Sequence, residues 1–427
     1  MAANEISLND AVQNNVRVLN VDPCTRGFPT LARWYIDIRE WEAHGLDLPL
    51  LNVISPAEQE AVKRFHHAAD KRMSLASHLL KYLYIHHACG VPWKDIVLTR
   101  TALPENRPYF KCPSGPHIDF NVSHQAGLTI LAGTIAVDQQ KFQSHATEGI
   151  PPLLSRLGID VTCVNEHRRK RLTTYEELVE FVSIFSEVFS DRELSAMKNP
   201  LSTLRQARDL GLAKAFPEPD TPESIARFGV RLFYSYWALK EAYLKMTGDA
   251  LLAPWVRTLE FTNVIPPDPV ELLPASKPYG QAKDQKHIPQ SPKNWGPPYK
   301  GVKITMGGRS IDDVRIQLAA FESDYIVATA GRGPPVGPIP QESEAGDQHH
   351  LPGQIKLDSG DQTQNLRIPI HAKKVVGDMD PWHVPFAITD PWLPMQEIDI
   401  ELDVRACAEG RCVHDDNHRY VLSSRSV

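Results

Sequence analysis

The sequence lacks an excess of positive charge. It has 46 lysines and arginines and 52 aspartates and glutamates, so the formal net charge is −6. A general nucleic-acid-binding protein would carry a basic surplus. No window approaches 18 consecutive apolar residues, which argues against a membrane-spanning helix. The opening stretch MAANEISLND has neither a basic start nor an apolar run and does not resemble a secretory signal. We therefore expect a cytoplasmic protein that binds neither nucleic acid nor membranes.

Cysteine is also scarce, with six in 427 residues, and only Cys407 and Cys412 are close in sequence. Because no CxxC pair occurs, neither a disulfide framework nor a zinc ribbon is indicated. Zinc binding is the weakest alternative. The pairs His66-His67 and His86-His87, together with the two close cysteines, lack four-ligand spacing. Adjacent histidines on a helix also point in different directions.

What is present indicates an ordinary globular protein with a core, because 42% of residues are hydrophobic and 23% charged. The length suits two domains with room for a third. Proline is abundant, with 35 residues against 24 glycines. Nine prolines fall between residues 266 and 298, and Gly331–Gln354 is again rich in proline, glycine and polar residues. Both stretches are expected to be surface segments.

Capping signals mark the expected helices. Ser55-Pro56-Ala57-Glu58 combines a cap, a first-turn proline and a reciprocal Glu, and the pattern ends near Gly90. Its length predicts two helices or one that is kinked near residues 68–70. Further cap signals lie at Thr174–Glu177 and Ser190–Glu193, and a helix is expected over Arg231–Thr247.

Strands are expected in the following order: Trp93–Leu103, Ile118–Val122, Gly127–Val137, Leu157–Val164, Gly301–Thr305 and Val314–Ala330. A polar turn, Ser123–Ala126, joins the second and third. After residue 331 little independent folding is expected, although Trp382, Phe386 and Trp392 could dock onto the main body.

The first of three polar clusters is Phe120–Gly127. Its turn could present N–H groups, Ser123 and His124 to an anion, or could merely satisfy its own backbone. A Ser–His nucleophile pair is disfavoured because neighbours in extended chain point to opposite faces. The second cluster places Asp160 in an apolar strand. It either binds a cation such as Mg²⁺ or faces solvent at the strand end.

The third cluster aligns Trp237, Glu241 and Lys245 on one helix face, four residues apart. Glu241 and Lys245 could form a surface ion pair or belong to a partly buried phosphate-and-metal site. Basic residues upstream offer further anion capacity or are solvated surface charges: Lys63, Arg64, Lys71, Arg72, Arg100 and Arg107.

Taken in order, these clusters resemble the 4′-phosphopantetheinyl transferase superfamily in its long, surfactin-synthetase-type branch, with fungal and animal members. The matching stretches are Asn106–Tyr109, FNVSHQAG at Phe120–Gly127, Gly158–Asp160, and WALKEA at Trp237–Ala242 with Lys245. The resemblance covers roughly residues 25–262 and 300–332.

The resemblance implies a mixed α/β fold of two similar halves, a pseudo-dimer with the active site in the cleft between them. Residues 1–150 would form the N-terminal half. Residues 151–332 would form the C-terminal half, with a proline-rich insertion at about 265–300. Residues 333–427 would be a largely irregular tail. The protein is expected to be a monomer.

The implied reaction moves the phosphopantetheine arm of coenzyme A to a serine of acyl and peptidyl carrier proteins and releases adenosine 3′,5′-bisphosphate. The implied carriers belong to polyketide, fatty-acid and nonribosomal peptide synthetases and to aminoadipate reductase. Two alternatives remain open: a metal-dependent phosphoester or nucleotide hydrolase, and a non-catalytic carrier-binding scaffold.

By motif position, Asp160 and Glu241 would bind Mg²⁺, or alternatively Mn²⁺, and would be catalytic together with Lys245. Thr162 stands where many bacterial relatives have a further acid, so water or Gln125 would complete the metal shell. Because Ala69 replaces a basic residue of some relatives, Lys71 or Arg72 could take over its contact. The implied coenzyme A ligands are Arg72, Arg100, Arg107, Asn121, Ser123, His124, Lys240 and Lys245.

Overall fold

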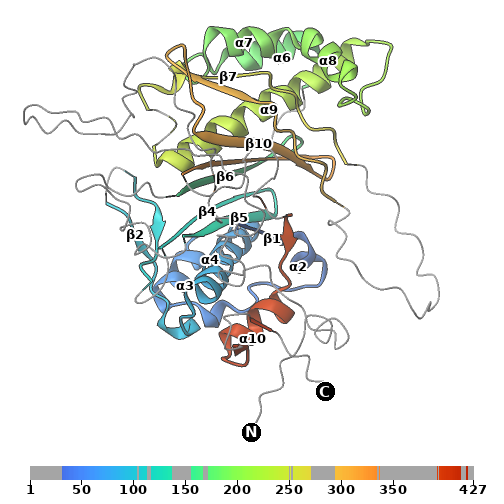
Figure 1. Cartoon of the computed structure of the whole chain (residues 1–427). Coiled ribbons are helices and arrows are strands. Elements are labelled where there is room, and N and C mark those ends of the chain that lie inside the picture. The colour runs from blue at the N-terminus through green and yellow to red at the C-terminus, as the bar shows by residue number, and fades with distance from the viewer. Residues whose placement is uncertain are drawn as a thin grey trace, which may run out of the picture.

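The computed structural model describes residues 31–102, 105–112, 117–136, 155–166, 172–249, 253–270, 294–333 and 394–414, together with residues 251, 336, 392, 420 and 421. The fold mixes helices and sheets, as predicted. Each half of the chain packs one long helix on a small sheet (Figure 1). The predicted boundary near residue 150 and most of the proline-rich insertion lie outside the described residues. In the described part of the chain, no helix combines the length and apolar character needed to cross a membrane.

The N-terminal half is built on the sheet β12-β1-β5-β4. Its strands are β1 (Leu31–Asp37), β4 (His117–Gln125), β5 (Leu128–Ala136) and β12 (Gln396–Glu397), and β1 was not predicted. Helix α4 (Ala68–Cys89) packs on this sheet. It follows α3 (Pro56–Lys63), which has the predicted Ser55–Glu58 capping box, so two helices are confirmed. The smaller elements are α2 (Arg39–Ala43), η1 (Leu51–Val53), η2 (Trp93–Asp95), β2 (Thr99–Arg100) and β3 (Pro108–Tyr109).

The C-terminal half is built on the antiparallel sheet β10-β11-β6, which helix α9 (Pro222–Thr247) crosses. The strands are β6 (Arg156–Cys163), β10 (Val314–Phe321) and β11 (Tyr325–Arg332). The remaining elements are α6 (Tyr175–Ser183), α7 (Asp191–Lys198), α8 (Pro200–Asp209), η3 (Val256–Thr258), β7 (Leu259–Thr262), β8 (Lys303–Met306) and β9 (Arg309–Ser310). Gly158 lets α9 approach closely, because a Cβ there would lie 1.9 Å from the Ala242 carbonyl oxygen.

The two sheets meet at their edge strands β4 and β6 through a ladder of side chains. The carboxylate, amide or hydroxyl oxygens of Asp119, Asn121, Ser123 and Gln125 accept the backbone N–H groups of Leu157, Ile159, Val161 and Cys163, respectively, at 2.7–3.3 Å. Alternate residues of β4 thus supply the acceptors that a neighbouring strand would otherwise provide. This ladder fixes the position of Ser123 relative to β6.

Several predicted elements need correction. The polar stretch Ser123–Gln125 is the end of strand β4, and the turn is the two-residue Ala126–Gly127 with positive φ at both positions. Because these polar side chains bond to another strand, they do not need a turn. Helix α9 begins at Pro222, nine residues before the predicted start, after a Thr221 cap. Trp93–Leu103 contains a 3₁₀ turn and only a two-residue strand.

The C-terminal segment returns to the N-terminal half, where it is drawn in red beside the blue helices (Figure 1). Trp392 is buried and bridges to Leu31, and β12 pairs with β1 in parallel. A π-helical turn (Ile400–Val404) and α10 (Arg405–Ala408) then bury Ile400 and Val404 in the core around α4. Strands β13 (Val413–His414) and β14 (Tyr420–Val421) follow. The predicted docking of Trp392 is confirmed, whereas Trp382 and Phe386 lie outside the described residues.

Candidate active site

Asp160, Ser123 and Lys245 form one hydrogen-bonded group where β6, β4 and α9 meet. The Lys245 ammonium lies 2.6 Å from Asp160 Oδ1 and 2.8 Å from Ser123 Oγ. The Ser123 hydroxyl in turn donates to Asp160 Oδ1 at 3.0 Å. The Asp160 side chain is 8% exposed and that of Lys245 is 27% exposed. Lys245 therefore reaches both a buried carboxylate and solvent.

Glu241 lies one helical turn before Lys245 and is half-buried. Burial raises the pKa of its carboxyl group, and the negative charge of Asp160 raises this pKa further, while Lys245 opposes both effects. Two carboxylates from different elements thus repel each other in a partly desolvated place. A pair of this kind is typical of a functional site, because it needs a cation or a proton to be stable.

A second charged group lies around Lys81, a residue on α4 that the sequence analysis did not select. The Lys81 side chain is buried, and desolvation lowers its pKa to about 8, with Arg100 contributing to the decrease and Glu58 opposing it. His124 faces solvent on one side. Partial desolvation of the His124 imidazole lowers its pKa, and the positive charges of Lys245 and Lys81 lower this pKa further. Within the described residues the Lys81 ammonium makes no hydrogen bond or ion pair. Its helical position, among apolar neighbours, gave no sign of this.

Arg107 and Asn121 hold the two halves together. The Arg107 guanidinium donates to the Met246 and Leu157 carbonyl oxygens and to the Asp119 carboxylate at 2.7–3.2 Å. Asn121 accepts the Ile159 N–H. Both side chains are buried. Their contact with coenzyme A stays a prediction.

Arg72 and Lys240 make their polar contacts with groups other than Asp160. Arg72 donates to the Asp47 carbonyl oxygen and pairs with Glu42 at 3.5 Å. Lys240 is fully buried in the core of the C-terminal half, 2.9 Å from the Glu193 carboxylate, and also donates to the Leu259 carbonyl oxygen. Since consecutive helical residues differ by about 100° in direction, Lys240 cannot share the face of Glu241. The prediction that Lys240 binds cofactor is corrected to a structural ion pair.

The acidic residues fit a divalent metal ion. Asp160 Oδ2 has no hydrogen-bond partner within the described residues, and Glu241 supplies the second carboxylate. Oxygen donors of this type suit Mg²⁺. Gln125, considered above as a further ligand, uses its oxygen for the Cys163 N–H and its amide group for Glu166. Acids faced by Lys245 and His124 suit an enzyme site for a phosphorylated substrate.

Comparisons with known proteins identify the family. Residues 39–136 match the family described as 4′-phosphopantetheinyl transferase, N-terminal, and residues 156–284 match the 4′-phosphopantetheinyl transferase superfamily. The 4′-phosphopantetheinyl transferase A of Aspergillus fumigatus is 41% identical over 406 residues, which cover 90% of this chain and 96% of the relative. NpgA of Emericella nidulans is 37% identical over 90% of this chain and 96% of the relative. The human L-aminoadipate-semialdehyde dehydrogenase-phosphopantetheinyl transferase is 23% identical over 73% of each chain.

The chain therefore belongs to the 4′-phosphopantetheinyl transferase family. Its activity is transfer of the phosphopantetheine arm of coenzyme A to a serine of carrier proteins.

Proposed function

We propose that Asp160, Glu241 and Lys245 form the reaction centre of this transfer. The observation that supports this most directly is that Asp160 on β6 and Glu241 on α9 lie beside Lys245, whose side chain reaches solvent. We infer that Asp160 and Glu241 hold one Mg²⁺, with Mn²⁺ as an alternative. When bound, such an ion would polarise the phosphoryl oxygens and neutralise their charge. Asp160 comes from β6, and Glu241 and Lys245 come from α9, so a diphosphate between the strand and the helix could contact all three.

In the proposed reaction the carrier serine oxygen attacks the phosphorus that bears the pantetheine arm. The bond from this phosphorus to the bridging oxygen breaks, and adenosine 3′,5′-bisphosphate leaves with the bonding electrons. The serine proton passes to Glu241, directly or through a water molecule. Lys245 neutralises the charge that develops on the leaving phosphate.

Coenzyme A would place its 3′-phosphate among Lys81, Arg100 and His124. Support comes from Lys81, whose side chain is buried and whose pKa is lowered by desolvation and by the charge of Arg100, so that the nearby Glu58 carboxylate compensates only part of the cost of its charge. A phosphate there would stabilise all three cationic or hydrogen-bonding side chains at once. We therefore add Lys81 to the proposed coenzyme A ligands and remove Lys240 from them.

For the carrier, we propose the phosphopantetheine-bearing domains of polyketide and nonribosomal peptide synthetases, fatty-acid synthase and aminoadipate reductase. The last would link the protein to lysine biosynthesis. The relatives named after L-aminoadipate-semialdehyde dehydrogenase support this choice. We further propose a cytoplasmic monomer with its site in a cleft between two similar halves.

The test is to incubate the protein with an apo-carrier, coenzyme A and Mg²⁺ and to weigh the carrier by mass spectrometry. The wild type and Glu223→Gln, an exposed acid in the first turn of the same helix, should add the phosphopantetheine mass. Glu241→Gln should not. Full activity of Glu241→Gln would refute its role as base, and full activity after removal of divalent ions would refute the metal.

A further inference from the structure

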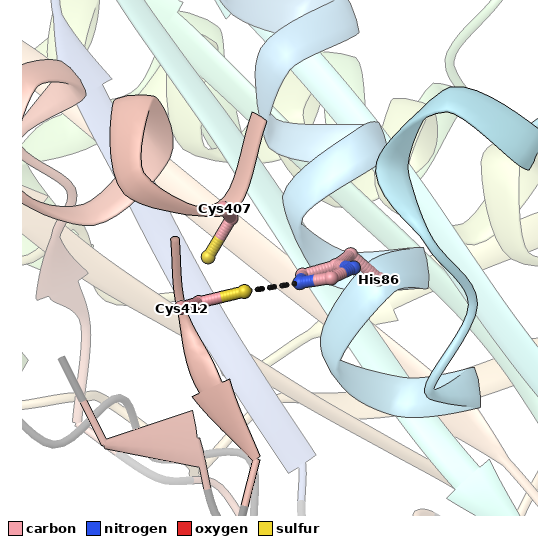
Figure 2. Close-up of side chains that lie close together, drawn as sticks. All are labelled: His86, Cys407 and Cys412. Carbon is pink, nitrogen blue, oxygen red and sulfur yellow. Dashed lines mark hydrogen bonds between the residues drawn. The ribbon is translucent and has the colours of Figure 1, made fainter. Parts of the chain in front are cut away.

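Three potential metal ligands from distant parts of the chain converge in the N-terminal half (Figure 2). His86 lies in the last turn of α4, Cys407 in α10, and Cys412 just beyond that helix. His86 Nε2 is 3.2 Å from Cys412 Sγ, although 326 positions separate the two residues. One ligand atom from each of the three side chains lies within 4.8 Å of the other two.

The backbone after α10 brings the two cysteines together. The Gly410 N–H donates to the Cys407 carbonyl oxygen at 3.1 Å, and the Arg411 N–H donates to the Ala406 carbonyl oxygen at 2.8 Å. These two bonds, with Gly410 in the left-handed region at φ 68°, form a Schellman motif that ends the helix. The chain reverses there, so Cys412 returns to the side of Cys407.

The imidazole of His86 is oriented for a metal. Its Nδ1 lies 2.7 Å from the Val91 carbonyl oxygen. Because a carbonyl oxygen only accepts, Nδ1 carries the proton, and in the neutral ring Nε2 has a lone pair directed at the two sulfurs. An N–H group bonded to a carbonyl in this way is the usual support of a metal-binding histidine.

We propose that His86, Cys407 and Cys412 bind one zinc ion. Zn–S bonds of about 2.3 Å and Zn–N bonds of about 2.0–2.1 Å place tetrahedral ligand atoms roughly 3.5–3.8 Å apart. This spacing lies between the 3.2 Å from His86 Nε2 to Cys412 Sγ and the 4.8 Å limit for the whole group. Two thiolates with imidazole are the donors that zinc prefers. His87 lies next to the group, with Nε2 3.7 Å from Cys407 Sγ, and a water molecule completes the fourth position.

The site fastens the C-terminal segment to α4 and is separate from the transfer reaction. That segment supplies Ile400 and Val404 to the core around α4 and the strand β12 to the sheet. The same helix carries Lys81, one and a half turns before His86. Zinc binding therefore stabilises the half of the protein in which the proposed 3′-phosphate ligands lie, without any contact to the diphosphate.

The experiment measures zinc by elemental mass spectrometry in the full-length protein, purified under reducing conditions and then exposed to ZnCl₂ and desalted. Wild type is expected to retain about one zinc per chain. Cys412→Ser and His86→Gln should lose it. Cys112→Ser is the matched control, since Cys112 is a half-buried free thiol in the same half.

Cobalt(II) substitution gives a readout that does not depend on any variant folding. Thiolate-to-cobalt charge-transfer bands and tetrahedral d–d bands are expected for the wild type and for Cys112→Ser. Chelation of zinc should lower the melting temperature by at least about 5 °C. A reduced wild-type protein without zinc or thiolate–cobalt bands would overturn the proposal, as would a Cys407–Cys412 disulfide in a protein that binds no metal.

Discussion

Replacing Lys81 by methionine should make the protein more stable while weakening coenzyme A binding. The side chain is buried, and its pKa falls from 10.5 to about 8 on folding. At about 1.4 kcal/mol per pKa unit, the shift corresponds to roughly 3 kcal/mol of unfavourable free energy at neutral pH. Methionine fills a similar volume without charge, so the free energy of unfolding at pH 7 should rise by about 2–3 kcal/mol.

The pH dependence of this effect follows from linkage. Between pH 8 and 10.5 the unfolded chain binds the Lys81 proton and the folded chain does not, so the stability contributed by this group increases with pH. The advantage of Lys81→Met is therefore complete below pH 8 and small at pH 10. Urea unfolding at both pH values measures it, with the exposed Lys94→Met as control. A variant that is less stable than the wild type at pH 7 would refute the reasoning.

The same variant should bind coenzyme A more weakly. Loss of a charge-assisted hydrogen bond of about 1.5–3 kcal/mol raises the KM for coenzyme A roughly 10- to 100-fold. In the wild type, kcat/KM for coenzyme A should decline as pH rises through about 8, because Lys81 loses its charge there. Unchanged KM in Lys81→Met would remove Lys81 from the phosphate site.

Three further predictions concern the reaction centre and its support. Glu241→Gln should lower kcat at least about 100-fold, and kcat/KM of the wild type should fall on acidification as Glu241 takes up a proton, a limb that the variant lacks. Gly158→Ala places a Cβ 1.9 Å from a backbone oxygen of α9 and should cost about 3 kcal/mol or more in urea unfolding; a loss below 0.5 kcal/mol would contradict the close contact. Lys240→Met should lose about 3–5 kcal/mol because Glu193 stays buried without its cation, and adding Glu193→Gln should restore part of that loss. If the loss in the double variant equals the sum of the losses in Lys240→Met and Glu193→Gln, the two residues are not coupled and the account of this pair is wrong.

The local signals in the sequence predicted local structure well. The capping boxes at Ser55, Thr174 and Ser190 all form, because each depends on side chains three residues apart. Helical spacing likewise placed Glu241 and Lys245 on one face. The order of the motifs also predicted that Asp160, 81 positions before Glu241, lies close to these residues, and its contact with Lys245 agrees with this. Helical spacing alone does not predict a contact with a separate strand.

Long-range contacts decided what the sequence could not indicate. Asn121 and Ser123 looked like turn residues, since nothing local shows that they accept N–H groups from a strand 38 positions later. Lys81 looked like an ordinary helix residue because its burial depends on tertiary packing. Sequence spacing made zinc binding by His86, Cys407 and Cys412 the weakest alternative. Their proximity depends on the return of the C-terminal segment to α4, which sequence spacing does not show.

The most direct measurement is a crystal structure of the protein with coenzyme A and Mg²⁺. We expect one ion bonded to carboxylate oxygens of Asp160 and Glu241 at about 2.0–2.1 Å, with Lys245 on a phosphate oxygen of the diphosphate. The account is contradicted if the diphosphate and its ion lie elsewhere, or if Lys245 still pairs with Asp160 and no ion separates the two acids.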